Sequence, residues 1–302
     1  MASEQTESAK APENKDTLPG FLYALAAYLL WGLLPYYMKA VAHVPALEVV
    51  AHRVVWSLPI AGVILLLRGR MGDVIAALRN PKMLSMAAVT ASIITVNWLI
   101  YVWSIAADRA LESALGYYIN PLLSVSLGAV MLGEKLRPGQ MVAIGLAITA
   151  VGILTYETGG IPWVSISLAV SWAFYAYLRK TLPVGPNQGF FLEVLILSVP
   201  ALGYLIYLQS RGEGHFLTGS ASDTWLLMAA GIITAVPLML YANGAKLLRL
   251  STIGIMQYIA PTMIFLSAVF VFHEPFGMTK LVAFGLIWLG LVIYSISMYR
   301  GR

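Results

Sequence analysis

The chain has 302 residues, of which 59% are hydrophobic and 11% charged, and its mean hydropathy is +0.79. Soluble domains carry about a quarter charged residues, so this composition excludes a water-soluble globular protein and indicates a membrane protein. The absence of cysteine excludes disulfides, thiolate metal sites and cysteine nucleophiles.

Ten stretches of the sequence are apolar over about the 20 residues that a membrane-spanning helix needs. In chain order they cover about 18–38, 47–67, 83–106, 112–132, 139–156, 162–180, 190–208, 224–246, 252–272 and 279–299. Residues 1–17 are polar and mixed in charge, so we expect a disordered cytoplasmic tail. This tail lacks the basic start and the cleavage site of a signal peptide, so the first span is expected to remain as an anchor.

The positive charges alternate from loop to loop. Of the 19 Lys and Arg residues, 14 fall on one side of the expected membrane, 4 fall on the other side, and Arg53 lies inside a span. The positive-inside rule therefore places both termini in the cytoplasm. The net charge of +5 reflects this topology. Because the basic residues form no continuous patch, the expected partners are the lipid bilayer and a small-molecule substrate, with no nucleic acid and no obligate protein partner.

The second half of the chain repeats the first half at an offset of about 140 residues. Related pairs include Tyr101 and Tyr241, Tyr118 and Tyr258, Pro121 and Pro261, Glu134 and Glu274, and Trp31 and Trp172. The repeats cover 18–156 and 162–299, and residues 157–161 link them. Because each repeat has five spans, the two must insert in opposite orientations. The sequence thus predicts an all-α membrane protein with ten transmembrane helices in two inverted five-helix repeats.

Each repeat carries a Tyr-Ile-x-Pro motif near the middle of a span, ending at Pro121 and Pro261. A proline inside a helix leaves the carbonyl four residues earlier without its donor, here the carbonyls of Tyr117 and Gln257. At membrane depth such a carbonyl needs a partner from another helix, water or substrate. The prolines either only bend packed helices or break helices that line a cavity. Their pairing by the repeat favours the cavity.

Arg53 is the clearest charge inside a span, and His52 and Glu48 lie close to it in sequence. Burying an arginine in a bilayer costs about 2.5–3.5 kcal/mol on insertion scales, so Arg53 should face protein or a wet cavity. It either binds an anionic group of a substrate, forms a structural ion pair, or extends to the outer boundary. Glu48 and His52 are four residues apart and could pair. Two such ligands make no zinc site, so no metal is expected.

Glu193 occupies roughly the position of His52 in the second repeat. It is either an ordinary charge at a span end or a buried carboxylate that carries a coupling proton. If transport is coupled to protons, the expected carriers are Glu48, His52 and Glu193.

Polar and aromatic residues near the middle of the spans are the candidates for a binding site. Mid-span Trp31 and Trp172 do not fit the interfacial aromatic belt, and amides inside spans commonly bridge helices. The residues expected to line a substrate cavity are Trp31, Arg53, Asn97, Tyr101, Tyr117, Tyr118, Trp172, Tyr241, Asn243, Gln257 and Tyr258.

The sequence carries no catalytic signature. It has no G-x-S-x-G, no P-loop lysine and no H-E-x-x-H. We therefore expect neither an enzyme nor a bound cofactor. An ATP-driven pump is excluded because the chain has no nucleotide-binding domain.

Several long segments resemble the EamA family of the drug/metabolite transporter superfamily and, within it, the RarD-type proteins of bacterial inner (plasma) membranes. These are EVVAHRVVW, NWLIYVWSIAADRALESALGYYINPLLSVSLGAVMLGEKL, SWAFYAYLRK and QYIAPTMIFLSAVFVFHEPF. The resemblance covers about 18–299. It implies two five-helix repeats, alternating access and export of small metabolites, with the first, third, fourth, sixth, eighth and ninth spans around the cavity.

The leading functional hypothesis is a secondary active exporter of small organic metabolites, such as amino acids, aromatic compounds or drugs. Arg53 would attract an anionic group of the substrate. A facilitative channel or uniporter would also use a polar midplane, and a channel would show no counterflow. An intramembrane enzyme acting on a lipid-linked substrate would need paired acid and base groups in one cavity, and the sequence offers only scattered candidates.

Overall fold

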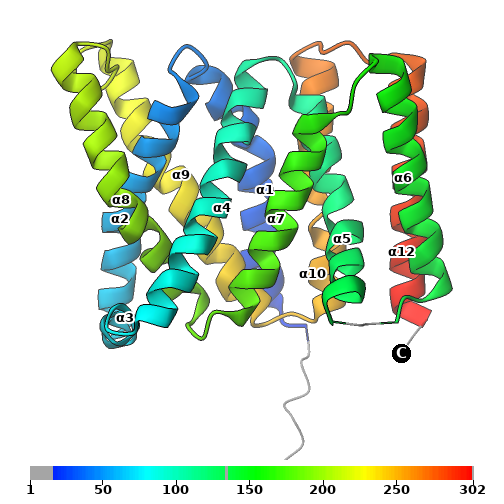
Figure 1. Cartoon of the computed structure of the whole chain (residues 1–302), viewed down its shortest axis with the longest axis horizontal. Coiled ribbons are helices and arrows are strands. Elements are labelled where there is room, and N and C mark those ends of the chain that lie inside the picture. The colour runs from blue at the N-terminus through cyan, green and yellow to red at the C-terminus, as the bar shows by residue number, and fades with distance from the viewer. Residues whose placement is uncertain (1–15, 133–134, 301–302) are drawn as a thin grey trace, which may run out of the picture.

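The computed structural model describes residues 16–132 and 135–300, which form helices and turns and contain no strand. The helices stand side by side in one bundle (Figure 1). They are α1 (Leu18–Ala40), α2 (Ala46–Leu67), α3 (Met71–Leu78), α4 (Pro81–Ala106), α5 (Ala110–Leu132), α6 (Pro138–Thr158), α7 (Trp163–Thr181), α8 (Pro186–Arg211), α9 (Ala221–Ala245), α10 (Leu250–Met256), α11 (Ile259–Leu266), the π-helix η1 (Ser267–Val271) and α12 (Met278–Arg300). Most of the expected tail, residues 1–15, and Glu134 lie outside the described residues.

Nine helical segments of the described chain are long and apolar enough to cross a membrane. This confirms a multi-pass, all-helical membrane protein. The expected sixth span, 162–180, corresponds to α7, which is not among the nine. Its 19 residues include polar side chains such as Ser165, Ser171 and Arg179, which lower its hydropathy. Because α7 packs against α4 and α5, Ser165 can donate to the Glu112 carbonyl of α5 and Ser171 can accept from Asn97 of α4. The tenth span remains a prediction.

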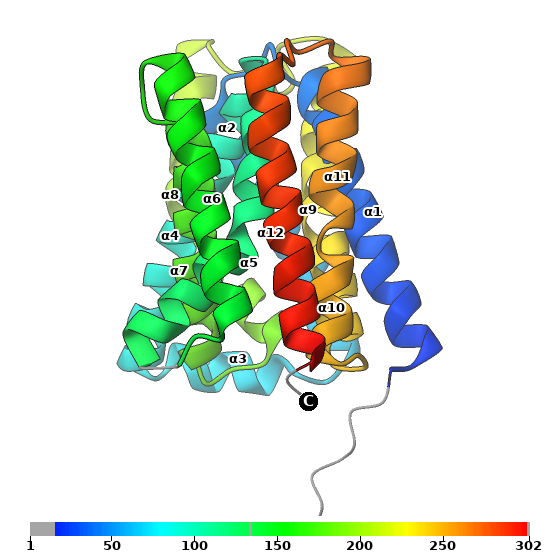
Figure 2. The same ribbon diagram turned by 90° about the vertical axis from the view of Figure 1, so that its right-hand side faces the viewer.

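The positions of the helix ends show how the chain runs through the bundle. The start of α1 and the end of α12 lie at the same end of the bundle, whereas α7 begins at the opposite end (Figure 1). The short helix α3 was not expected from the sequence. It lies across the end of the bundle in the connection from α2 to α4 (Figure 2). Gly69 permits the reversal after α2 because its φ of 63° is open mainly to glycine.

The two repeat-related prolines have different effects on their helices. The ninth span is interrupted at Gln257 and Tyr258, between α10 and α11, and Pro261 lies in the first turn of α11. A proline there removes no helical hydrogen bond, because the first N–H groups of a helix have no partner inside it. By contrast, α5 runs unbroken through Pro121. The expected break at Pro121 is therefore absent, since a long helix packed against α7 and α11 tolerates one missing bond.

A close approach of α2 and α9 positions the most important charge in the bundle. A Cβ atom added to Gly231 of α9 would lie 2.3 Å from the backbone carbonyl carbon of Trp56 in α2, so only glycine fits there. Ser57 Oγ also donates a hydrogen bond to the carbonyl oxygen of Gly231 at 3.3 Å. This contact brings Arg53 of α2 beside Thr234 of α9.

The helices α6 and α12 pack mainly against each other and stand at one side of the bundle (Figures 1 and 2). The remaining long helices surround the middle of the molecule.

Candidate substrate-binding cavity

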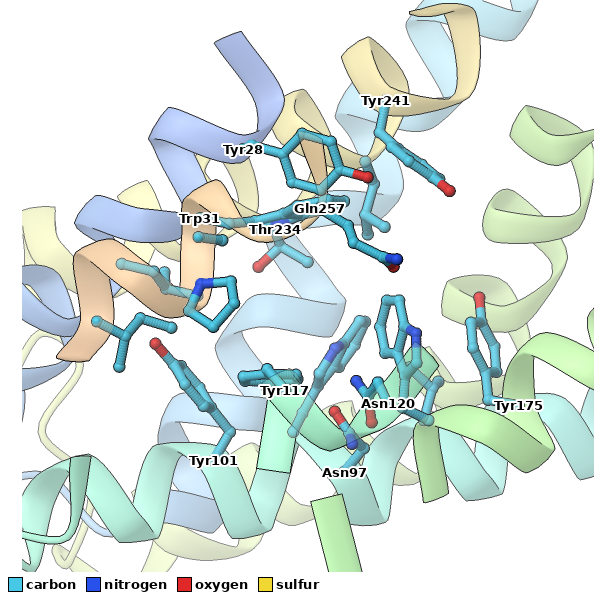
Figure 3. A pocket seen from close by; sticks show the side chains of 18 of the residues that line it. Tyr28, Trp31, Asn97, Tyr101, Tyr117, Asn120, Tyr175, Thr234, Tyr241 and Gln257 are labelled. Carbon is cyan, nitrogen blue, oxygen red and sulfur yellow. The ribbon is translucent and has the colours of Figure 1, made fainter. Parts of the chain in front are cut away.

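A cavity of about 150 Å³ lies among seven segments: α1, α2, α4, α5, α7, α9 and the break between α10 and α11 with its following turn (Figure 3). These are the six spans that the family resemblance implied, together with α2. The lining residues are Tyr28, Trp31, Leu34, Arg53, Ile94, Asn97, Trp98, Tyr101, Tyr117, Asn120, Trp172, Tyr175, Thr234, Leu238, Tyr241, Gln257, Ala260, Pro261 and Ile264.

Arg53 is a buried cation without a carboxylate partner among the described residues. Its side chain is enclosed, with 4% of the residue exposed. Nε donates a hydrogen bond to Thr234 Oγ1 at 2.9 Å, and the guanidinium carbon lies 4.8 Å from the centre of the Trp98 ring. Nη1 is buried and has no hydrogen-bond partner. An unpaired buried donor on a cation is costly, and an anionic acceptor beside this atom would remove that cost.

The expected alternatives for Arg53 can now be compared. Burial inside the bundle argues against extension to the outer boundary, and no ion pair with Glu48 or Glu193 is formed, because those carboxylates bind other cations and donors. What holds Arg53 in place is a threonine hydroxyl and an aromatic face. Thr234 donates its own hydroxyl proton to the carbonyl of Ala230, so toward Arg53 it acts as an acceptor.

Two asparagines and a tyrosine present further unpaired polar atoms. Asn97 Nδ2 donates to the Leu168 carbonyl at 3.1 Å and to Ser171 Oγ at 2.9 Å, which fixes the amide orientation because a carbonyl can only accept. Its Oδ1 is left buried without a donor. The Oδ1 of Asn120 and the hydroxyl of Tyr101 are also buried and unpartnered. All three residues line the cavity, which therefore offers both acceptors and donors to a ligand.

Aromatic rings form two clusters in the cavity wall (Figure 3). Tyr28, Trp31 and Tyr241 lie within 5.5–5.9 Å of one another, measured between ring centres. In the second cluster, Tyr117 lies 5.8 Å from Tyr101 and 6.5 Å from Trp172. Edge-to-face and tilted packing at these distances keeps the rings ordered and supplies apolar area for a ligand ring.

Three of the expected lining residues lie away from the cavity. Tyr118 packs between α5 and α12, and its hydroxyl is 2.7 Å from Thr262 Oγ1. Asn243 donates to the Met239 carbonyl and accepts a hydrogen bond from Arg68 at 2.8 Å. Tyr258 is absent from the lining, and its hydroxyl is buried without a partner. These residues were expected because they are polar or aromatic and lie inside the spans, but such a position does not fix which way a side chain points, since each residue turns a helix by about 100°.

The expected pair of Glu48 and His52 is not formed. Glu48 instead accepts two hydrogen bonds from His215 in the loop between α8 and α9, one from the backbone N–H at 2.7 Å and one from Nδ1 at 2.8 Å. Trp56 Nε1 donates to His52 Nδ1 at 3.1 Å. An indole nitrogen can only donate, so this ring nitrogen carries no proton and His52 is neutral. Neither Glu48 nor His52 lines the cavity.

Glu193 also lies outside the cavity lining, but it contacts a residue that belongs to it. Tyr175 donates its hydroxyl to Glu193 Oε2 at 3.1 Å, and Arg179 Nε lies 3.3 Å from Oε1. The carboxylate is therefore separated from the cavity by one tyrosine side chain.

Five polar or aromatic lining residues were not expected from the sequence. They are Tyr28, Trp98, Asn120, Tyr175 and Thr234. The helical period could have indicated three of them. Tyr28 lies three residues before the expected Trp31. Asn120 and Tyr175 each lie three residues after an expected residue, Tyr117 and Trp172. Residues three or four apart share a helix face. Examining the positions three residues before and after each expected residue would therefore have found Tyr28, Asn120 and Tyr175.

No group of three or more His, Asp or Glu side chains in the described parts of the chain could hold a metal ion. The cavity thus presents a cation, amides, hydroxyls and aromatic rings.

Comparison with known proteins identifies the family. Residues 18–156 match the EamA-like transporter family. An uncharacterized transporter of Vibrio cholerae is 42% identical over 286 residues, which is 95% of each chain. Protein RarD of Streptomyces exfoliatus is 40% identical over 91% of this chain and 88% of its own length. The chain belongs to the EamA-like transporter family.

Further comparisons agree with this membership. Protein RarD of Escherichia coli is 39% identical to this EamA-like transporter over 93% of this chain and 95% of its own. The predicted resemblance to the RarD type is thereby confirmed. A solved structure, titled only as the crystal structure of a protein, superposes with a TM-score of 0.62 at 20% identity and covers 94% of this chain and 98% of its own. It shows a shared fold.

Proposed function

We propose that this EamA-like transporter is a secondary active exporter of small organic metabolites that carry an anionic group, with amino acids as the leading candidates. The observation that carries the proposal is Arg53, a buried cation whose Nη1 has no anionic partner and whose side chain lines the cavity. A substrate carboxylate would supply the missing acceptor. Hydrogen bonds to charged groups contribute about 1.5–3 kcal/mol, so this contact would dominate recognition.

The other unpaired atoms extend the substrate description. The acceptors Asn97 Oδ1 and Asn120 Oδ1 suit an ammonium group, and the hydroxyl of Tyr101 can serve either end. The aromatic clusters suit an apolar or aromatic side chain. A cavity of about 150 Å³ is close to the size that holds a benzene ring. Phenylalanine combines such a ring with a carboxylate and an ammonium group, so it offers a partner to each of these kinds of group.

The transport mechanism follows from the proposed topology. We infer that α7 is the sixth of ten spans and that the halves 18–156 and 162–299 are inverted repeats. The opposite starting ends of α1 and α7 support this, as does the alternation of basic residues between loops (Figure 1). The same charge pattern favours cytoplasmic termini in a bacterial inner membrane. Rocking of one half against the other would then expose the cavity alternately at each face.

We propose protons as the coupling ion. Because few ionisable side chains lie inside the spans, only three residues are candidates for carrying them. Of the three expected carriers, Glu48 and His52 are held by His215 and Trp56 away from the cavity. Glu193 contacts the cavity-lining Tyr175.

Three ligands that share a phenyl ring test which charged group of the substrate the protein recognises. Purified protein would be screened by thermal shift with phenylalanine, 3-phenylpropionate, which lacks the ammonium, and phenethylamine, which lacks the carboxylate. We expect phenylalanine to stabilise the protein most and phenethylamine least, since Arg53 repels a cation. Equal stabilisation by phenethylamine and 3-phenylpropionate would overturn the role of Arg53.

Variants and a transport assay complete the test. Arg53→Ala should weaken binding of phenylalanine by about tenfold to hundredfold, and Arg53→Lys should restore only part of it because lysine lacks the guanidinium geometry. Arg211→Ala, at an exposed arginine beside Glu213, is the matched control. In proteoliposomes loaded with phenylalanine, an exporter would accumulate labelled phenylalanine by counterflow. Simple equilibration without counterflow would indicate a channel.

A further inference from the structure

The buried carboxylates of this transporter differ in the number of hydrogen bonds that they accept. Glu48 and Glu274 each accept two hydrogen bonds of 2.9 Å or less. Glu193 is as buried as Glu48, with 1% of the residue exposed, but only its Oε2 accepts a hydrogen bond. Its Oε1 is buried without a hydrogen-bond donor. A carboxylate at this depth with one oxygen left without a donor is poorly stabilised in its charged form, and this favours its protonation, on either oxygen.

Arg179 attracts Glu193 without satisfying it. Arg179 Nε lies 3.3 Å from Oε1, within ion-pair distance, but Oε1 accepts no hydrogen bond from it. Arg179 Nη2 donates instead to the carbonyl of Pro186 at 2.8 Å. Tyr175 and Arg179 of α7 are the titratable groups that face Glu193, and α4 contributes only the hydroxyl of Thr90. Within the described residues, no ion pair or hydrogen bond joins Glu193 to a charged group of α2, α3 or α9.

Tyr175 joins this carboxylate to the cavity. Its ring stands at the edge of the cavity beside Trp172, at 5.9 Å between ring centres (Figure 3). Its hydroxyl donates to Glu193. A tyrosine hydroxyl can accept one proton while it donates another, so it can pass a proton between two groups that do not touch.

We propose that Tyr175 relays the coupling proton between the cavity and Glu193, an inference that rests on the proposed transport function. In the relay, a hydronium ion in the cavity gives a proton to the oxygen of Tyr175, and the proton already on that oxygen moves to Glu193 Oε2. The tyrosine is unchanged, the cavity loses one proton and the carboxylate becomes a neutral acid. The ion pair between Arg179 and Glu193, which ties α7 to α8, is then lost. Protonation thereby loosens a contact between cavity-lining α7 and its neighbour.

Proteoliposomes with a pH gradient test the relay, using phenylalanine as the probe. Glu193→Gln should retain counterflow but lose at least about tenfold of the uphill transport that the gradient drives, since the amide cannot exchange a proton. Tyr175→Phe keeps the ring and removes the hydroxyl, so uphill transport should fall while counterflow remains. Tyr294→Phe, at a buried tyrosine of α12 outside the cavity lining, and Glu48→Gln should retain both. Unchanged uphill transport in both test variants, or its loss in Glu48→Gln alone, would overturn the relay.

A second measurement needs no transported substrate. Infrared difference spectra of the purified full chain, recorded between about pH 5 and 9, should show a carboxylic acid band that Glu193→Gln removes. Tyr175→Phe should move the midpoint of that band. If the band titrates as expected but no ligand undergoes counterflow, the proposed export fails, while proton transfer to Glu193 through Tyr175 stands without its coupling role. If counterflow occurs but no band depends on Glu193, the relay fails while the export stands.

Discussion

Glu274 caps the first turn of α5 by accepting a hydrogen bond from the backbone N–H of Ala110 at 2.6 Å, although 164 residues separate the two. Its second oxygen accepts from the N–H of Leu111 at 2.9 Å. The first N–H groups of a helix have no partner inside it, and the positive end of the helix dipole favours an anion there. One side chain of the second half therefore holds the start of a cavity-lining helix of the first half.

Removing the charge of Glu274 should destabilise the fold. In Glu274→Gln one oxygen becomes an NH₂ group, which faces a backbone donor. We expect a loss of about 1–3 kcal/mol, the cost of leaving a buried backbone N–H without an acceptor, seen as a lower midpoint of thermal unfolding in detergent. Glu112→Gln is the control, because Glu112 is partly exposed and its carboxylate pairs with its neighbour Arg109. Equal effects of the two substitutions would contradict the cap.

Replacing the acceptor of Arg53 should weaken ligand binding without removing the cation. Thr234→Val is nearly the same shape but leaves Arg53 Nε without a partner. We expect phenylalanine binding to fall by about tenfold, through loss of the guanidinium orientation and one buried hydrogen bond. Thr234→Ser keeps the hydroxyl and should bind normally in the same titration. A fully active Thr234→Val protein would show that Trp98 alone positions the guanidinium.

The contact of α2 with α9 should not tolerate an added methyl group. In Gly231→Ala, the new Cβ would lie 2.3 Å from the Trp56 backbone, and the two helices would have to separate. Overpacking of this kind typically costs about 1–3 kcal/mol. Gly203→Ala in α8 is the matched control, because no other side chain or helix lies within 4 Å of the place its new Cβ would take, and alanine favours a helix. Thermal unfolding of both variants is the measurement, and a Gly231→Ala protein as stable as Gly203→Ala would contradict the packing.

The start of α1 should lose its tie to α10 in acid. Asp16 accepts hydrogen bonds from the side chain and backbone N–H of Arg249 at 2.8 Å each, and these lower the pKa of Asp16 to about 2. Because the folded-state pKa lies below the ordinary value of 3.8, the stabilisation is present above about pH 4 and is lost as the pH falls toward 2. The protection factors of the backbone amides in residues 16–20, which compare each exchange rate with that of an unstructured chain at the same pH, should fall over that window. Asp16→Asn should show low protection at every pH, and wild-type protection that stays constant would refute the tie.

Much of the fold was accessible from the sequence because hydropathy and loop charge are local properties. They located the membrane helices to within a few residues, including the stretch that became α10, α11 and η1. The contrast between Pro121 and Pro261 was not accessible, because whether a proline interrupts a helix depends on what packs around it. Nothing in the sequence pattern indicated α3 either.

The sequence also predicted part of the candidate site. Trp31, Asn97 and Tyr101 were expected in the cavity and do line it, because polar or aromatic residues at mid-span rarely face lipid. Tyr117 lines the cavity, whereas the next residue, Tyr118, points toward α12, because one step along a helix turns the side chain by about 100°. The partner of Glu48 could not be predicted from the sequence, because His215 lies in a loop 167 residues away.

Under the proposed carrier mechanism, the unpaired Nη1 of Arg53 also bears on the rate of the transport cycle. An empty carrier must carry an uncompensated positive charge through its occluded state, where water no longer screens it. A carrier loaded with a carboxylate passes the same state with that charge neutralised. Return of the empty carrier should therefore be the slow step, and exchange of internal for external phenylalanine should outpace net efflux in the same vesicles. In Arg53→Ala the two rates should converge.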